Sequence, residues 1–107
     1  MNYLDHIARD IERAIPAQTR PADDAQAMYR LYALLVLTRG TGTSLADVHN
    51  AWSVWMLERG MDHESLVPFE ELPAEVQRED EPFQRAIISI AQRLDRKRRP
   101  PSLQKPR

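Results

Sequence analysis

Apolar residues recur at steps of three and four along most of this chain, the spacing that places them on one face of an α-helix. Four segments carry the pattern, at about residues 3–15, 22–39, 45–59 and 81–96. The first of them has the apolar stripe Leu4, Ile7, Ala8, Ile11 and Ile15. No stretch alternates apolar and polar residues for long, so we expect no strands. The pattern predicts an all-α fold, a compact bundle of four main helices.

The second segment differs from the others because its middle, MYRLYALLVL, is apolar on nearly all sides. Such a helix is expected at the centre of a fold, in contact with several neighbours. Asp23 and Asp24 are predicted in its first turn, where the helix dipole favours acids. Gly40 and Gly42 end it.

Local signals set the limits of the later helices. Ser44 and Asp47 form a capping-box pattern at the start of the third segment, and Gly60 ends it. Pro73 fits the first position of a short helical turn, and Asp80 precedes the fourth long helix. Between the third helix and the short turn lies one ordered loop.

The length of 107 residues and the hydrophobic fraction of 42% suit a single globular domain. The net charge of -1 is unevenly distributed: residues 93–107 hold seven basic residues and one acid, a balance of +6, so residues 1–92 carry -7. We therefore expect one helical domain over residues 1–96 and a disordered basic tail over 97–107. No helix-turn-helix spacing accompanies the tail, so nucleic acid is not an expected partner.

Several classes of function are not expected from this composition. There is no cysteine for a disulfide, a thiolate nucleophile or a cysteine-based zinc site. The longest apolar run, residues 31–37, is too short to cross a bilayer, and the N-terminal residues do not resemble a secretory signal. A cytoplasmic protein without membrane contact is the expectation.

Residues that could support catalysis or metal binding do not form an established pattern. His49 and His63 lack a known ligand spacing, and a hydrogen-bonded structural role is expected for His49. Ser65, His63 and Asp62 supply the residue types of a triad, but no glycine-flanked elbow is present. We expect no metal, no cofactor and no enzymatic activity.

The loop DHESLVPFEEL, residues 62–72, is expected to clamp the domain. Its apolar residues anchor it to the helices, Pro68 fixes its course, and His63 is predicted to hydrogen-bond to the third helix. Trp52 and Trp55 are neighbours on that helix. Trp52, at the edge of the core beside His63 and Phe69, would form an aromatic wall for a flat ligand.

The segments VHNAW, HESLVPFEEL and QRED together resemble the core of the RyR domain, the repeat named from ryanodine receptors and also found in small bacterial and phage proteins. The residues that carry the resemblance are His49, Trp52, His63, Leu66, Val67, Pro68, Phe69, Leu72 and Asp80. It covers residues 45–91. The whole chain also resembles a group of small uncharacterised actinobacterial and actinophage proteins.

Two functions follow as expectations. The RyR-like resemblance implies a non-enzymatic binding domain for a nucleotide or another small planar ligand. Its candidate ligand-binding residues are His49, Trp52, His63, Pro68 and Phe69. The alternative is a helical protein–protein interaction protein, a phage or mobile-element accessory factor that docks to a protein partner or forms a homodimer.

Overall fold

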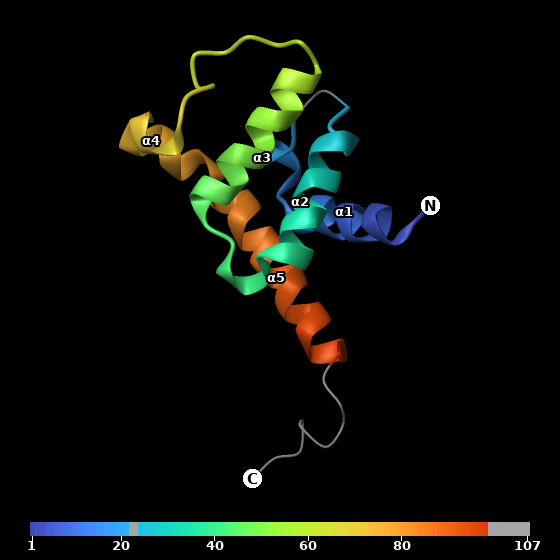
Figure 1. The fold of residues 1–107 in the computed structure, drawn as a ribbon. Helices are drawn as coiled ribbons and strands as arrows, with labels where there is room; N and C mark the ends of the chain where they lie inside the picture. Colours follow the sequence, from blue (N-terminus) through green and yellow to red (C-terminus); the bar gives the residue numbers. More distant parts are fainter. Residues whose placement is uncertain (22–23, 99–107) are drawn as a thin grey trace.

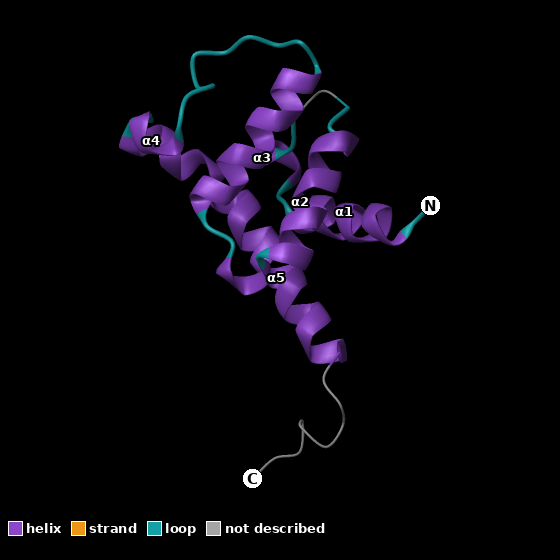
Figure 2. Cartoon of the chain, viewed as in Figure 1, coloured by secondary structure: helices purple, strands orange, loops and turns teal. Residues whose placement is uncertain are grey.

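The computed structural model describes residues 1–21 and 24–98 of the chain. The α-helices are α1 (Tyr3–Ala14), α2 (Gln26–Thr38), α3 (Leu45–Glu58), α4 (Ala74–Gln77) and α5 (Glu81–Arg98). Short 3₁₀ turns lie at Ala17–Thr19, Gly40–Gly42, Phe69–Glu71 and Arg78–Asp80. Across these two described ranges there is no strand (Figure 2). The prediction of an all-α fold is confirmed, with four main helices, the short α4 and one ordered loop.

Helix α2 lies at the centre and packs against α1, α3 and α5 (Figure 1). The side chains that it buries are Met28, Tyr29, Tyr32, Ala33 and Val36. The central position predicted from its apolar middle is therefore confirmed. Its start was predicted too early, since the helix begins at Gln26 and Asp23 lies outside the described residues. The carboxylate of Asp24 accepts a hydrogen bond from the backbone N–H of Gln26 at 3.2 Å, which holds Asp24 in a turn before the helix.

The other long helices bury the stripes that the sequence predicted. Ile11 and Ile15 from the first stripe and Ile87 and Ile90 of α5 are almost fully enclosed. At the start of α3 the Ser44 hydroxyl accepts from the N–H of Asp47 at 3.0 Å, and the Asp47 carboxylate accepts from the N–H of Ser44 at 2.9 Å. This reciprocal pair confirms the predicted capping box.

After α3 the chain reverses at Gly60, whose φ of 69° is the left-handed conformation that glycine adopts without strain. The loop 61–68 then returns beside α3 and leads through the 3₁₀ turn Phe69–Glu71 to α4 (Figure 1). The 3₁₀ turn Arg78–Asp80 also contacts α3 and continues directly into α5. The loop and both turns are thereby held against one helix.

The C-terminal helix is longer than the domain boundary predicted at residue 96, because α5 continues through Lys97 and Arg98. The remaining part of the tail predicted as disordered, residues 99–107, lies outside the described residues. Among the helices of the described ranges, none combines the length and apolar character required to cross a membrane.

Candidate functional site

His49 joins α3 to the loop that follows it. Its side chain is buried, with an exposed fraction of 3%, and its Nε2 lies 2.7 Å from the carbonyl oxygen of Val67. Because a carbonyl oxygen only accepts hydrogen bonds, Nε2 must carry the proton in this contact. The structural, hydrogen-bonded role predicted for His49 is confirmed. Its hydrogen bond holds the loop against α3.

His63 was predicted to make the hydrogen bond between loop and helix, and that prediction is wrong. Its Nδ1 accepts a hydrogen bond from the backbone N–H of Ser65 at 3.0 Å, so the bond closes a tight turn within the loop. A ring that accepts at Nδ1 carries its neutral-state proton on Nε2. His63 reaches α3 through its ring instead, which meets Trp52 edge to face at 5.3 Å between centroids.

Four rings form a continuous row along α3 and the loop. The rings of His49 and Trp52 are stacked, with centroids 5.7 Å apart and planes at 26°. His49 also contacts Phe69, with ring centroids 6.2 Å apart and planes at 53°. The row therefore runs Phe69, His49, Trp52, His63. Trp52 is half-buried, so part of its ring remains available at the edge of the core.

This row borders a cavity of about 150 Å³ between α3, the loop and the chain that leads into α5. Its lining residues are His49, Trp52, His63, Ser65, Leu72, Val76, Glu79 and Asp80. Three of the predicted site residues, His49, Trp52 and His63, are brought together here. Phe69 contacts His49 but does not line the cavity, and Pro68 is exposed on the loop outside it.

A second, larger cavity of about 470 Å³ adjoins the first, since Trp52, His63, Glu79 and Asp80 line both. Tyr32, a residue of the hydrophobic core, also lines it. The guanidinium carbon of Arg59 lies 4.3 Å from the centroid of a Trp55 ring in the same cavity. The four shared residues thus stand where the two spaces meet.

Asp80 is the acid at this junction, and its environment is unusual for a carboxylate. Its pKa is raised to about 6: burial is the main cause, the nearby His49 lowers the pKa, and the charge of Glu79 raises it. Burial, together with the charge of Asp80, holds the pKa of Tyr32 well above its usual range. From the sequence, Asp80 was predicted only to precede the fourth long helix and to belong to the RyR-like set of residues. Its place in one cavity with Trp52 and His49 was not predicted.

The geometry of the site also bears on the catalytic and metal-binding arrangements considered from the sequence. The Nδ1 atom of His63 is occupied by the backbone of Ser65, so this ring nitrogen is not poised to activate the Ser65 hydroxyl. Within residues 1–21 and 24–98 no group of three or more His, Cys, Asp or Glu side chains is placed to hold a metal ion. What the cavity offers is a ring surface with hydrogen-bonding groups at its edge.

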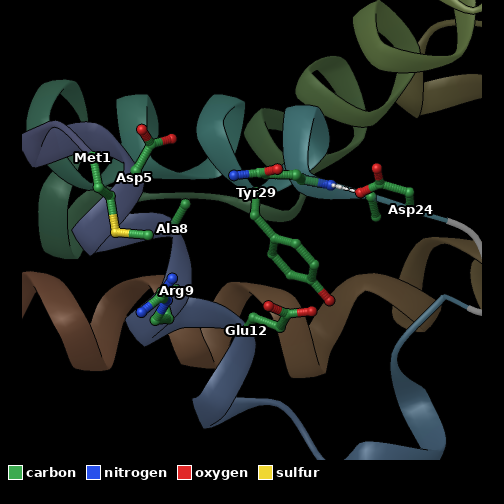
Figure 3. Close-up of a pocket in the computed structure, with 9 residues that line it drawn as sticks. Met1, Asp5, Ala8, Arg9, Glu12, Asp24 and Tyr29 are labelled. Atoms are coloured by element: carbon green, nitrogen blue, oxygen red, sulfur yellow. Dashed lines mark hydrogen bonds between the residues drawn. The ribbon is translucent and has the colours of Figure 1, made fainter.

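A separate cavity of about 320 Å³ lies between α1 and the start of α2 (Figure 3). The hydroxyl of Tyr29 is enclosed there, with no hydrogen-bond partner among residues 1–21 and 24–98, and it points toward the Glu12 carboxylate (Figure 3). Other polar groups of the lining hold the fold together: Asp5 accepts from the Arg30 side chain at 2.6 Å, and Asp24 accepts from the Gln26 backbone. This cavity contains none of the predicted site residues.

Fold and cavity together define a small all-α protein with an acid-edged aromatic cavity beside its third helix. The chain belongs to a protein family described as a domain of unknown function (DUF7701), which matches residues 2–92. The match includes every residue of both cavities beside α3. No curated protein and no solved structure matches the chain.

Replacement of Asp80 tests the environment of this acid through folding stability. The native carboxyl keeps its proton up to about pH 6, whereas its ordinary pKa is 3.8, so the native state binds more protons between these values. Stability contributed by this group is therefore present at low pH and lost as the pH rises through 6. Asp80→Asn stays neutral and should therefore be more stable than wild type at pH 7.5. The expected gain is only about 1–2 kcal/mol, because water still reaches part of the carboxyl and screens its charge.

Urea unfolding at pH 3 and pH 7.5 measures the difference, which should vanish at pH 3, below both pKa values. Glu75→Gln removes an exposed acid from α4 and serves as the matched control, with little change at either pH. A wild-type protein as stable as Asp80→Asn at pH 7.5 would contradict the burial of this charge.

Proposed function

We propose that this protein is a non-enzymatic binding domain that holds a small planar ligand against Trp52, in the cavity beside α3. The observation that carries the proposal is the row of rings from Phe69 to His63, which ends at two adjoining cavities. Aromatic side chains provide a large apolar contact area and stack with flat heterocycles. Ligand sites commonly combine such walls with a few fixed polar groups.

The tether at His49 supports this proposal because it fixes the geometry before any ligand arrives. The bond to Val67 holds both the ring of His49 and the loop that carries His63. A second bond, from Gln77 Nε2 to the carbonyl oxygen of Phe69 at 3.0 Å, holds the turn at the end of the loop. A preformed site loses less conformational entropy on binding than a mobile one.

The resemblance of residues 45–91 to the RyR domain supports the same proposal. The residues that carry it include His49, Trp52, His63 and Asp80, all of which line the smaller cavity. The nucleotide ligand that this resemblance implies directs the first experiments to nucleosides. The heterocyclic base, rather than the phosphate, is the part that matches the ring surface.

Fluorescence titration gives a direct test because the chain has two tryptophans. In Trp55→Phe, Trp52 is the sole tryptophan and reports on the cavity. We expect saturable quenching of Trp52 by at least one of adenosine, guanosine and cytidine, and no response to ribose. At a ligand concentration of about 100 times Kd, binding should stabilise the fold by about 2.7 kcal/mol, measured as a higher melting temperature.

The matched variant Trp52→Leu keeps Trp55 and should lose the thermal stabilisation. A nucleoside that stabilises Trp52→Leu as strongly as the wild-type protein binds elsewhere. That result, or the absence of any response in Trp55→Phe, would count against the proposed function.

A second candidate function, self-association, rests on a different surface. Val54 and Leu57 lie three positions apart near the end of α3 and are 45% and 64% exposed. These two residues form a short apolar stripe that the described part of the chain leaves uncovered. A second copy of the same stripe would cover it symmetrically, as in most homodimers.

This candidate predicts a dimer that depends on the stripe. Light scattering coupled to size exclusion should then give twice the chain mass of 12.4 kDa for the wild-type protein, and the single mass for Leu57→Glu. Leu34→Glu, at a 49% exposed position of α2 outside the stripe, is the control and should remain dimeric. A wild-type monomer at all concentrations up to about 1 mM, where even weak association is detectable, rejects this candidate.

A further inference from the structure

The smaller cavity beside α3 contains hydrogen-bond acceptors that no described residue satisfies. Nε2 of His49 donates a hydrogen bond to the Val67 carbonyl, which leaves Nδ1 as an acceptor in the neutral ring. Across residues 1–21 and 24–98, no group donates a hydrogen bond to this Nδ1 or to the Asp80 carboxylate. Both residues line the cavity, so these acceptors are open to a donor placed inside it.

The charges of the lining point in the same direction. Glu79 and Asp80 are the acids of the smaller cavity, and among the residues that the structure describes no lysine or arginine lines it. The groups that face Asp80 from the packed elements are His49 on α3, Tyr32 on α2 and Glu79 on its own turn, with His63 on the loop lining the same cavity. Arg59 lines the larger cavity, which Asp80 also borders, and its guanidinium lies over Trp55 there. A phosphate or carboxylate placed beside Asp80 would be repelled, while a cation would be attracted.

The aromatic row adds a preference for shape. A cation close to the face of an indole ring is attracted by the electrons of the ring, and a flat cation also keeps the contact area of a stacked ligand. Trp52 and Asp80 both line the two cavities. A planar group with several N–H donors would meet the carboxylate, Nδ1 of His49 and the indole together.

We propose that the cavity selects a planar nitrogen cation, of the amidinium or protonated aminoheterocycle class, with Asp80 and Nδ1 of His49 as the acceptors of its N–H groups. This inference rests on the proposed function and specifies the ligand class of the same site. Amidinium groups carry donors on both nitrogens, so one nitrogen bonds the carboxylate while the other reaches the imidazole. A charge-assisted pair of this kind is about twice as strong as a neutral hydrogen bond.

Three probes of nearly the same size and shape separate charge from flatness: benzamidinium, benzamide and benzoate. At pH 7.5 each is titrated into the full chain, and the indole N–H signal of Trp52 is followed by NMR. Benzamidinium should bind at least about tenfold more tightly than benzamide, as expected for a charged partner in a partly buried site. Benzoate should bind more weakly than benzamide.

The variant Asp80→Asn keeps the shape of the side chain and removes its charge, and should reduce benzamidinium to the affinity of benzamide. Glu75→Gln, an exposed acid removed from α4, should leave all three affinities unchanged. If benzamide or benzoate binds as tightly as benzamidinium, or if Asp80→Asn has no effect, the cation preference is wrong although a planar ligand site remains. If none of the three probes shifts Trp52, the inference is also overturned. The nucleoside titrations of Trp55→Phe then decide the proposed function separately.

Discussion

The hydrogen bond between Nε2 of His49 and the carbonyl oxygen of Val67 is the constraint on which the rest of the site depends. The loop after α3 has no helix of its own between Gly60 and Phe69, so its course must be fixed by contacts with the helix beside it. The buried imidazole of His49 provides that contact, and its Nε2 proton is engaged in the hydrogen bond. The bond therefore has two consequences, since it positions the loop and determines which nitrogen of His49 remains free.

The position of the loop then decides which groups meet. Because the loop returns along α3, His63 comes to lie edge-on against Trp52, and the turns that follow bring Glu79 and Asp80 to the same cavity. The acid is enclosed enough for its pKa to rise, which is a cost to the folded protein at neutral pH. A carboxylate retained in such a place is a common feature of functional sites, where binding groups are kept at some expense of stability.

Helix positions were predictable from the sequence because periodicity and capping are local properties: the Ser44–Asp47 box and the central α2 appear as the pattern indicates. The candidate site was predictable in part, since the rings of His49, Trp52 and His63 lie together. The partners of the two histidines were not, because the residue types allow either ring to bond across the loop and only tertiary geometry decides between them. Asp80 is 31 positions from His49, a separation over which no local pattern connects them.

The most direct test of this account is the protonation pattern of the His49 ring, measured by ¹⁵N NMR of the imidazole nitrogens at a pH where the ring is neutral. The account predicts that Nε2 carries the proton, with slow exchange and a scalar coupling across the hydrogen bond to the Val67 carbonyl. It further predicts an unprotonated Nδ1 whose chemical shift responds to benzamidinium. A ring protonated at Nδ1, or an Nε2 proton that exchanges as fast as that of an exposed histidine, would contradict both the tether and the site built on it.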